Sequence, residues 1–344
     1  MDLDAVIERA VGFLLESRNS HGWWHDFINL AGTSKHWVTA YVAAQLVHEG
    51  GKATLSACKE SWRMLQNTAR EQGGWGYNDA TPPDADSTIW ALRLAEALGQ
   101  GESIAARHAY SFLRKHKQSN GGYSTYAAEG EIRHFTELPP EVSFRGWCGS
   151  HICVSAAAAT LVPGNFTSTC AMLRESQKLD GSWNGYWWLD DEYTTSLATE
   201  ALIRENIGEN ESHINRAIDW AIGRFSQRNC IHTANYPTGS PFATGLGLRI
   251  LTLGEPLSFD WNLVEKALEW LAKAQKEDGS WGGSALMRLP PPNVVDPHNY
   301  QNWKIGGRGA WSAIFDQNSN FTTATILSGI CSLRSKADGK LNAI

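Results

Sequence analysis

The sequence lacks the features that are typical of membrane-spanning, nucleic-acid-binding and secreted proteins. No apolar run approaches membrane-spanning length, the longest being short stretches such as residues 154–161. A net charge of −6 offers no basic surface for nucleic acid, so no nucleic-acid partner is expected. The 6 cysteines include no CxxC pair, and the N-terminus, Met1-Asp2-Leu3-Asp4, lacks the basic start and apolar core of a signal peptide. We therefore expect a cytoplasmic protein without a transmembrane segment, for which peripheral membrane contact is left open.

Tryptophan is the residue in excess, with 16 among 344 positions. Indole rings in such numbers build either a thick repeat core or an aromatic-lined cavity. A turn of the form Gly-x-Trp or Gly-Tyr recurs along the chain, as Ser20-His21-Gly22-Trp23, Gln72-Gly73-Gly74-Trp75, Asn120-Gly121-Gly122-Tyr123, Asp180-Gly181-Ser182-Trp183 and Asp278-Gly279-Ser280-Trp281. The spacing predicts six units of roughly 50 residues, one of them degenerate near Asn229-Cys230.

Each unit has the same predicted order of helices. A helix rich in small residues follows each turn, over residues 37–46, 86–98, 151–161, 193–202, 242–251 and 321–327. Small side chains let backbones approach closely, as a crowded inner ring requires. Partner helices such as residues 61–70 and 262–275 carry apolar residues at helical spacing between charged ones, which is typical of a one-faced outer helix. Because strand signals are nearly absent and no capping unit is evident, we expect one all-α domain, residues 1–344, built as a closed ring of helical hairpins.

Two insertions interrupt the regular period. They cover residues 124–149 in the third unit and 282–320 in the sixth, and both are dense in Trp, Tyr, His and Arg. Insertions in a repeat array map to loops on one face, commonly the binding face. We interpret them as the lips of a cavity, although variable surface loops would give the same interruptions.

An acidic pair opens the second small-residue helix, in the stretch Pro82-Pro83-Asp84-Ala85-Asp86-Ser87-Thr88. The bland interpretation is a helix cap, since Asp favours that position. A cap explains one acid but not why Asp84, Asp86, two prolines and Trp90 come together in a single unit. A second carboxylate nearby, together with burial, raises the pKa of one member of such a pair. A buried acid that keeps its proton is therefore the preferred hypothesis.

These motifs resemble those of the squalene–hopene and oxidosqualene cyclase family. Gln177-x-x-Asp180-Gly181-Ser182-Trp183 and Gln275-x-x-Asp278-Gly279-Ser280-Trp281 look like its QW repeats, and Asp84-Ala85-Asp86-Ser87 looks like its DxDD-type motif, with Ser87 replacing the last Asp. The resemblance implies an (α/α)6 toroid and a class II terpene cyclase. It also implies that Asp86 is the proton donor and Asp84 its partner. Members of that family have a second helical domain, so this single ring suggests a shorter isoprenoid, such as a prenyl diphosphate, a terpenol or a prenylated aromatic compound.

Further candidate site residues follow from this hypothesis. When the units are aligned on Thr39, Thr88 and Ser155, His36 and His151 start the helices that flank the acidic pair, so we expect them to orient the acid or resupply its proton. Aromatic faces stabilise carbocations. The rings on or just before the small-residue helices are candidate cavity walls: Trp37, Tyr41, Trp90, Trp187, Trp188, Tyr193 and Phe242. Trp23, Trp75, Trp183 and Trp281 belong to the turns and are expected to be structural.

Candidates for holding a polar head group are Asp190, Asp191, Arg288, Lys304 and Arg308. The acids Asp190-Asp191-Glu192 would serve Mg²⁺ if the substrate is a diphosphate, and otherwise form a solvated helix start; no cofactor is expected apart from that case. The cysteines and histidines show no convincing tetrahedral ligand spacing, which argues against the zinc of the related prenyltransferases and lanthipeptide cyclases. Two alternatives stay open, a carbohydrate-active (α/α)6 enzyme and a non-catalytic toroid that binds an apolar ligand or peptide.

Overall fold

The computed structural model describes residues 2–162, 166–225, 229–254 and 261–337. Helices form most of it, which confirms the all-α class. One set of helices lies inside and consists of α2 (His36–Leu46), α4 (Ala85–Ala97), α7 (Ile152–Ala159), the first part of α9 (Glu192–Phe225), α10 (Pro241–Thr252) and α12 (Asn320–Ala337). The other set lies outside and consists of α1 (Leu3–Glu16), α3 (Lys52–Thr68), α5 (Ile104–Arg114), α8 (Thr167–Ser176), the second part of α9 and α11 (Trp261–Ala274).

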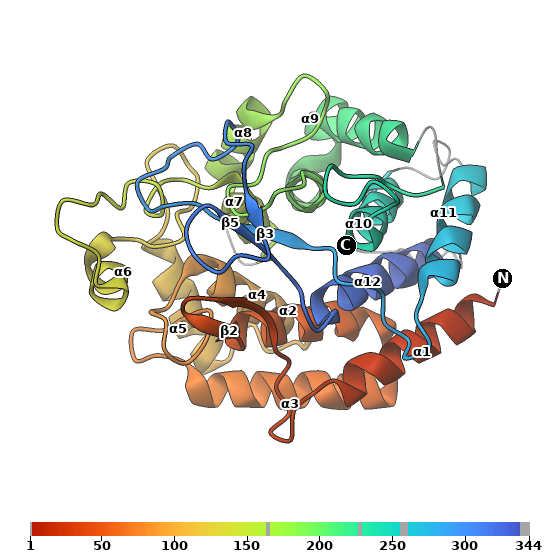
Figure 1. The fold of residues 1–344 in the computed structure, drawn as a ribbon, viewed down its shortest axis with the longest axis horizontal. Helices are drawn as coiled ribbons and strands as arrows, with labels where there is room; N and C mark the ends of the chain where they lie inside the picture. The colour runs from red at the N-terminus through yellow and green to blue at the C-terminus, as the bar shows by residue number, and fades with distance from the viewer. Residues whose placement is uncertain (1, 163–165, 226–228, 255–260, 338–344) are drawn as a thin grey trace.

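The inner helices form a closed ring of contacts. Each contacts the next in the order α2, α4, α7, α9, α10 and α12, and α12 contacts α2 (Figure 1). Outer helices pack against them, for example α3 on α2 and α11 on α10. This is the arrangement expected for an (α/α)6 toroid. Among the described residues, we find no helix with both the length and the apolarity to cross a bilayer.

Helix α9 belongs to both the inner and the outer set of helices because it bends sharply in the middle. Asn206 leaves helical geometry, with φ −170° and ψ 109°, and its side-chain oxygen accepts the N–H of Gly208 at 3.1 Å. The residues before the bend are almost all buried, while those after it alternate between buried and exposed. The inner and outer helices of this unit are thus joined without a loop.

A single type of hydrogen bond recurs in all six units. A backbone N–H of the turn donates to a Thr or Ser hydroxyl oxygen on the inner helix that follows. The pairs are Trp24–Thr39, Trp75–Thr88, Tyr123–Ser155, Trp183–Thr195, Ile231–Thr244 and Trp281–Thr323, at 2.7–3.3 Å. Trp24, and not Trp23, is therefore the repeat residue of the first unit. This bond fixes the height at which each inner helix begins.

The Gln-x-x-Asp-Gly-Ser-Trp turn joins three segments, as the turn at Gln177 illustrates. Its side-chain amide donates to the carbonyl oxygen of Gly181 at 2.8 Å and to that of His213, on the next outer helix, at 2.9 Å. Trp183 Nε1 donates to the carbonyl oxygen of Leu173 at 2.7 Å. Gly181 has a φ of +96°, and a Cβ there would lie 2.2 Å from the carbonyl oxygen of Arg216. The turn at Gln275 makes the same bonds and reaches Val6 of α1 at 3.0 Å, across the closure of the ring.

Because each inner helix begins at the same height, its inward-facing residues fall into three layers. Relative to the Thr or Ser that accepts the turn N–H, the upper layer lies two residues before it, the middle layer two residues after it and the lower layer five residues after it. This spacing of four and then three residues keeps to one helix face. The upper layer holds Trp37, Asp86, Cys153, Tyr193, Phe242 and Phe321. The middle layer holds Tyr41, Trp90, Ala157, Leu197, Leu246 and Thr325. The lower layer holds Ala44, Arg93, Thr160, Glu200, Arg249 and Ser328.

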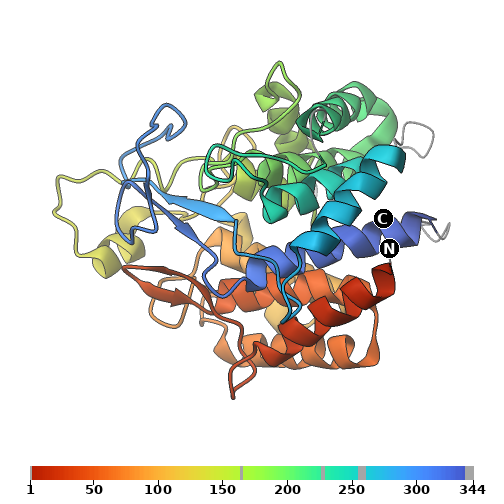
Figure 2. The same ribbon diagram turned by 45° about the vertical axis from the view of Figure 1, so that its right-hand side comes forward.

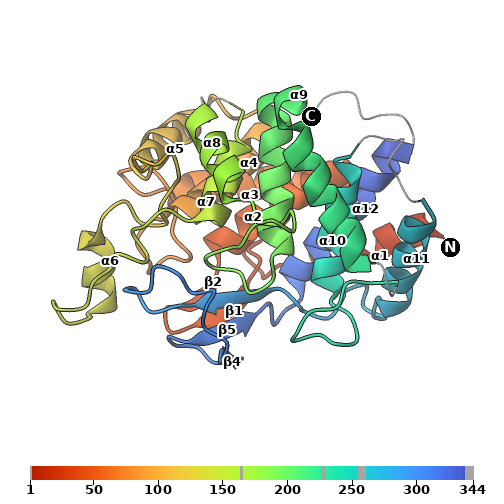
Figure 3. The same cartoon turned by 90° about the horizontal axis from the view of Figure 1, so that it is seen from above.

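Five short strands in the described part of the chain depart from the expectation that strands are nearly absent. The strands β1 (Asp26–Asn29) and β2 (Gly32–Ser34) form an antiparallel hairpin; β3 (Leu286–Leu289) pairs antiparallel with β5 (Ser312–Phe315), which also pairs parallel with β4 (Lys304–Ile305). Helix α6 (Glu129–Thr136) and the second sheet come from the two insertions. Figures 2 and 3 show these elements and the hairpin gathered on one side of the helix ring.

Two buried carboxylates join this side to the last inner helix. Asp26 accepts the backbone N–H groups of Asn318 at 2.8 Å and Asn320 at 2.9 Å. Asp316 accepts those of Thr322 at 2.7 Å and Ala285 at 3.1 Å. Burial raises the pKa of Asp26 to about 6, against the effect of these bonds. The pair links the first unit of the chain to the last.

We predict that Thr195→Val, which keeps the shape of the side chain, lowers the free energy of unfolding by about 1–3 kcal/mol. The buried N–H of Trp183 would lose its acceptor in this variant. Urea denaturation followed by circular dichroism measures the change. Thr195→Ser is the matched control, because it retains the hydroxyl group. Equal stability of the valine variant and the wild type would contradict a structural role for the bond.

Candidate active site

The acidic stretch forms the tight connection between the second turn and α4. The backbone N–H of Asp84 donates to the carbonyl oxygen of Trp75 at 2.9 Å, and a Cβ on Gly76 would lie 2.5 Å from a carbonyl oxygen of the same loop. Asp84 is the N-cap of α4: its Oδ1 accepts the N–H of Ser87 at 2.7 Å, and its Oδ2 accepts the hydroxyl of Ser87 at 2.8 Å. Asp84 therefore fills the capping role that the sequence left open for Asp86.

The carboxyl group of Asp86 takes no part in the cap. Burial, reinforced by the charge of Asp84, raises its pKa to about 8. The indole N–H of Trp37 is close enough to oppose this shift, although it lies outside normal hydrogen-bond geometry. Burial also raises the pKa of Asp84 to about 7, against the two bonds from Ser87. Both acids therefore tend to hold their protons near neutral pH.

Asp86 lies deep in the protein, yet part of its surface stays accessible. Tyr77 and Tyr126 share this combination, and Trp187 is also only partly covered. The charge of Asp86 raises the pKa of Tyr193, after burial, so these two side chains lie near each other.

Six of the seven predicted wall residues meet in one aromatic cluster with Phe321. Tyr41 stacks on Phe321 at 3.6 Å between ring centroids, and Trp90 meets Tyr41 at 4.4 Å. Trp188 stacks on Tyr193 at 4.1 Å. The remaining contacts bring in Trp37, at 5.1 Å from Phe321, and Phe242, at 5.7 Å from Trp188. Trp187 instead lies beside His151, at 5.7 Å, and Trp147, at 6.0 Å.

The sequence did not single out several rings of this region. Phe27 reaches the cluster from β1 through a left-handed backbone conformation, φ 40°, at a register shift of the hairpin. Tyr77 stacks on Trp37 at 6.0 Å, and Tyr126 lies 6.2 Å from Trp147. Tyr77 and Tyr126 lie in loops two and three residues after the repeat-turn residues Trp75 and Tyr123. Their place directly after a repeat turn is the sequence feature that could have identified them.

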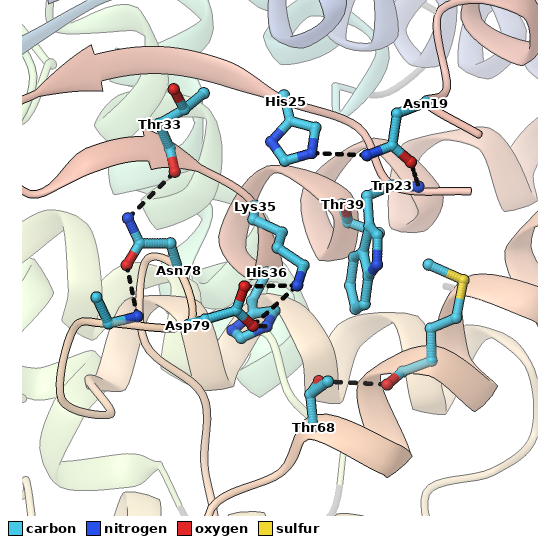
Figure 4. A network of polar contacts seen from close by, with 12 residues as sticks. Asn19, Trp23, His25, Thr33, Lys35, His36, Thr39, Thr68, Asn78 and Asp79 are labelled. Atoms are coloured by element: carbon cyan, nitrogen blue, oxygen red, sulfur yellow. Dashed lines mark hydrogen bonds and ion pairs between the residues drawn. The ribbon is translucent and has the colours of Figure 1, made fainter. Parts of the chain in front are cut away.

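The structure does not bring His36 to the acidic pair. Its Nε2 lies 3.0 Å from Asp79 Oδ1, and Lys35 binds the same carboxylate at 2.6 Å (Figure 4). Burial lowers the pKa of His36 to about 4, although the charge of Asp79 opposes this. Lys35 and Asp79 also line an open surface depression of about 530 Å³, whose lining includes neither Asp84 nor Asp86. The expectation that His36 reaches the acids is therefore wrong.

His151 is linked to the acidic stretch through Thr125. Its Nδ1 lies 2.8 Å from Thr125 Oγ1, and its Nε2 lies 2.8 Å from the carbonyl oxygen of Gly146. Because that carbonyl can only accept, Nε2 carries the proton and Nδ1 accepts from the Thr125 hydroxyl. The carbonyl oxygen of Thr125 in turn accepts the backbone N–H of Ala85 at 2.9 Å. Burial lowers the pKa of His151 to about 4, so the imidazole is neutral and both its nitrogens are occupied.

The second acidic cluster divides into two paired acids and one unpaired acid. Asp191 binds Lys178 at 2.8 Å, and Glu192 binds Arg224 at 2.7 Å. Asp190 Oδ2 is buried without a hydrogen-bond partner in the described part of the chain. Burial, together with the charge of Glu192, raises the pKa of Asp190 to about 7.

The three predicted basic residues lie in different environments. Arg288 on β3 is 3% exposed, donates to the carbonyl oxygen of Gly185, and lies 5.8 Å from the ring of Trp303. It makes no ion pair within the described residues, and its buried Nε finds no acceptor there. Burial lowers its pKa to about 10. Lys304 and Arg308 have exposed side chains.

The described residues contain no group of three or more His, Cys, Asp or Glu side chains arranged to hold a metal ion.

Comparison with known proteins gives one consistent result. No protein-family model matches the chain. The squalene–hopene cyclase of Zymomonas mobilis subsp. mobilis is 25% identical over 293 residues, which cover 71% of this chain and 43% of that enzyme. The chain thus spans about half the length of the curated relatives it matches.

Two solved structures resemble the chain over almost its whole length. The type II terpene cyclase MstE from Scytonema is 39% identical and superposes with a TM-score of 0.92 over 98% of this chain and 99% of its own. MstE has been solved with geranylgeranyl dihydroxybenzoate as substrate and with merosterolic acid A as product. A protein from Actinoplanes is 37% identical, with a TM-score of 0.91 over 97% of this chain and 100% of its own.

Sequence identities of 37–39% over almost the full length of both chains show the family, and the helix ring and the acidic motif described above are consistent with it. The chain belongs to the type II terpene cyclase family.

Proposed function

We propose that this enzyme cyclises a prenylated aromatic acid, and that Asp86 starts the reaction by protonating the terminal double bond of the prenyl chain. The observation that carries this proposal is the division between the two acids. Asp84 is committed to the helix cap, whereas Asp86 is buried, uncapped and level with four aromatic rings. Such a group has no evident structural use.

The proposed substrate class follows from similarity and size. MstE acts on geranylgeranyl dihydroxybenzoate, a prenylated aromatic acid, and matches this chain from end to end. Squalene–hopene cyclases, which share less sequence, are about twice as long. A single ring suits a chain shorter than squalene.

The raised pKa of Asp86 keeps its proton in place until the substrate arrives. In the proposed step the Asp86 O–H bond breaks, its proton adds to the less substituted alkene carbon, and the π electrons form the new C–H bond. This leaves a carboxylate and a tertiary carbocation. An acid with a pKa of about 8 transfers this proton only if the product ion pair is strongly stabilised. That task falls to the surrounding rings, whose faces attract cations by up to about 2 kcal/mol each when water is excluded.

The later steps of the proposed reaction take place within the prenyl chain. Each remaining double bond attacks the cation in turn, forming one C–C bond and moving the charge along the chain. The last cation loses a proton to water, and solvent returns a proton to the Asp86 carboxylate. Trp37, Trp90, Trp188, Tyr193 and Phe242 are the proposed walls. His151 positions the site rather than supplying protons, since both its nitrogens are already bonded and it holds the strand-like segment that binds Ala85.

The polar head group is proposed to bind near Arg288. A buried guanidinium without an ion pair has a strong preference for an anion, and a carboxylate matches its geometry. Asp190, protonated near neutral pH, would donate a hydrogen bond to a hydroxyl group of the same ring. No cofactor is proposed, because proton-initiated cyclisation needs none.

We expect Asp86→Asn to lower kcat/KM for geranylgeranyl dihydroxybenzoate by at least about a hundredfold, because the amide cannot donate a proton to an alkene. Asp84→Asn should lose less, since an amide oxygen still caps the helix. Wild-type kcat/KM should fall as pH rises through about 8, where Asp86 loses its proton. Product analysis by mass spectrometry provides the rates.

Geranylgeranyl diphosphate and squalene serve as comparison substrates, and Asp219→Asn, on the exposed face of α9, is the control variant. An Asp86→Asn enzyme that cyclises as fast as the wild type would exclude Asp86 as the acid.

The same substitution is expected to stabilise the protein increasingly as pH rises. The pKa of Asp86 is about 8 in the folded chain and near 4 when unfolded, so the folded form gives up stability as pH rises through this interval. The amide of the Asp86→Asn variant does not ionise and has no such penalty, so the difference should grow by roughly 1 kcal/mol for each pH unit. Urea titrations at pH values on either side of this window measure it. A difference independent of pH would mean that Asp86 is ionised in the folded protein.

Arg288→Gln should raise KM for the carboxylate substrate by at least about thirtyfold, because the substrate anion would be buried without its partner. The analogue without the carboxyl group, geranylgeranyl dihydroxybenzene, should show little change in KM. Lys304→Gln is the matched control on the surface of the same sheet. Equal losses with both substrates would indicate that Arg288 is structural.

A further inference from the structure

The lower layer of the ring is a polar cluster centred on one carboxylate. Glu200 binds Arg93 at 3.1 Å, Arg204 at 3.1 Å and Arg249 at 2.7 Å. Arg93 also donates to the hydroxyl oxygen of Thr160. Arg249 extends the cluster to Gln45 at 3.1 Å and Ser328 at 3.2 Å. Five inner helices thus contribute a side chain, and Thr160, the C-cap of α7, completes the ring.

The positive charges of the three arginines are balanced by Glu200 and by the C-terminal ends of the inner helices. Burial acts to raise the pKa of Glu200, but the three guanidinium groups outweigh it and hold that pKa far below its ordinary value. Several inner helices end at this level, and helix C-termini carry partial negative charge that favours cations. The surplus of arginine over glutamate therefore has a structural explanation and does not call for a bound anion.

Arg93 differs from the other two arginines in what lies above it. Its guanidinium lies 4.8 Å from the ring centroid of Trp90, one helical turn further up α4. Trp90 Nε1 donates to the hydroxyl oxygen of Tyr193 at 3.0 Å, and Tyr193 lies near Asp86. A chain of direct contacts thus runs from Glu200 through Arg93 and Trp90 to the level of the acid.

The indole of Trp90 is 1% exposed and borders a cavity of about 200 Å³, which is also lined by Gln45, His48, Arg93, Thr160 and Arg204. The guanidinium of Arg93, fixed by Glu200 and Thr160, stands on the cavity side of the ring.

We propose that Arg93 is a positioning residue for cyclisation, which holds the Trp90 indole in its place one turn below Asp86. The inference rests on the proposed function of Asp86 and Trp90. Cation–π attraction depends on the distance and tilt of the ring, so a displaced indole favours different carbocations along the prenyl chain. Loss of Arg93 then alters which products form, in addition to how fast they form.

Substitution at Arg93 leaves the rest of the cluster paired. In Arg93→Gln, Glu200 keeps Arg204 and Arg249, so no carboxylate is stranded. Arg93→Lys retains the charge near Trp90. Arg204→Gln is the matched control, because it removes one partner of Glu200 but no recorded contact to Trp90.

The test combines product analysis with a signal that does not depend on activity. With geranylgeranyl dihydroxybenzoate, Arg93→Gln is expected to lose about tenfold in kcat/KM and to release a larger share of partly cyclised products. Arg93→Lys should restore part of both, and Arg204→Gln should match the wild type. In parallel, the indole Nε1–H resonance of Trp90, assigned with Trp90→Phe, should shift in Arg93→Gln and stay in place in Arg204→Gln.

The outcomes separate this proposal from the previous one. If the wild type forms no cyclised product from the probe, the proposed substrate is wrong, and the indole resonance still decides the role of Arg93. Unchanged product ratios and an unchanged Trp90 resonance in Arg93→Gln would overturn the positioning role. Equal effects from Arg204→Gln would overturn it as well, because the cluster as a whole would then be responsible.

Discussion

The hydrogen bond from each repeat turn to a Thr or Ser of the next inner helix is the constraint on which the site depends. It sets the height and rotation of six helices at once, so residues at equal offsets meet around the ring. A register slip of one residue would rotate a side chain by about 100° around its helix and carry Asp86 away from the rings opposite. The chemistry of the upper layer therefore depends on a bond that contains none of the reacting groups.

The two acids of the motif share one helix start but meet different physical demands. Asp84 accepts two hydrogen bonds from Ser87, as a cap must, and these bonds favour its charge. Asp86 receives no comparable bond, so burial and its charged neighbour set its pKa. Ser87, which stands where related motifs have a third acid, thus has a defined use. It holds Asp84 in the capping position and leaves Asp86 to face the aromatic rings.

The sequence predicted the helical class and singled out most of the rings that meet in the aromatic cluster, because both rest on local periodicity. It failed where side-chain direction matters. His36 starts its helix beside the ring, but it precedes the inward position by one residue, which turns it by about 100° toward Asp79. Phe27, Tyr77 and Tyr126 escaped notice because they come from loops and a bulged strand, where no periodicity marks the inner face. The ion pairs of Asp191 with Lys178 and of Glu192 with Arg224 could not be predicted either, because they join residues that are distant in the sequence.

The order of the three layers has an electrostatic logic for a travelling carbocation. In the proposed reaction, the upper layer would hold the carboxylate of Asp86 after proton transfer, while the lower layer holds arginines in excess over Glu200. The cation would thus be attracted upward and repelled from below, which would keep it near the level of the acid. The middle layer separates the two and is apolar or aromatic except for Thr325, whose hydroxyl is bonded to Tyr41 at 2.6 Å. A free hydroxyl or carboxylate there would trap the cation before the rings had closed, so the middle layer has to be both electron-rich and unreactive.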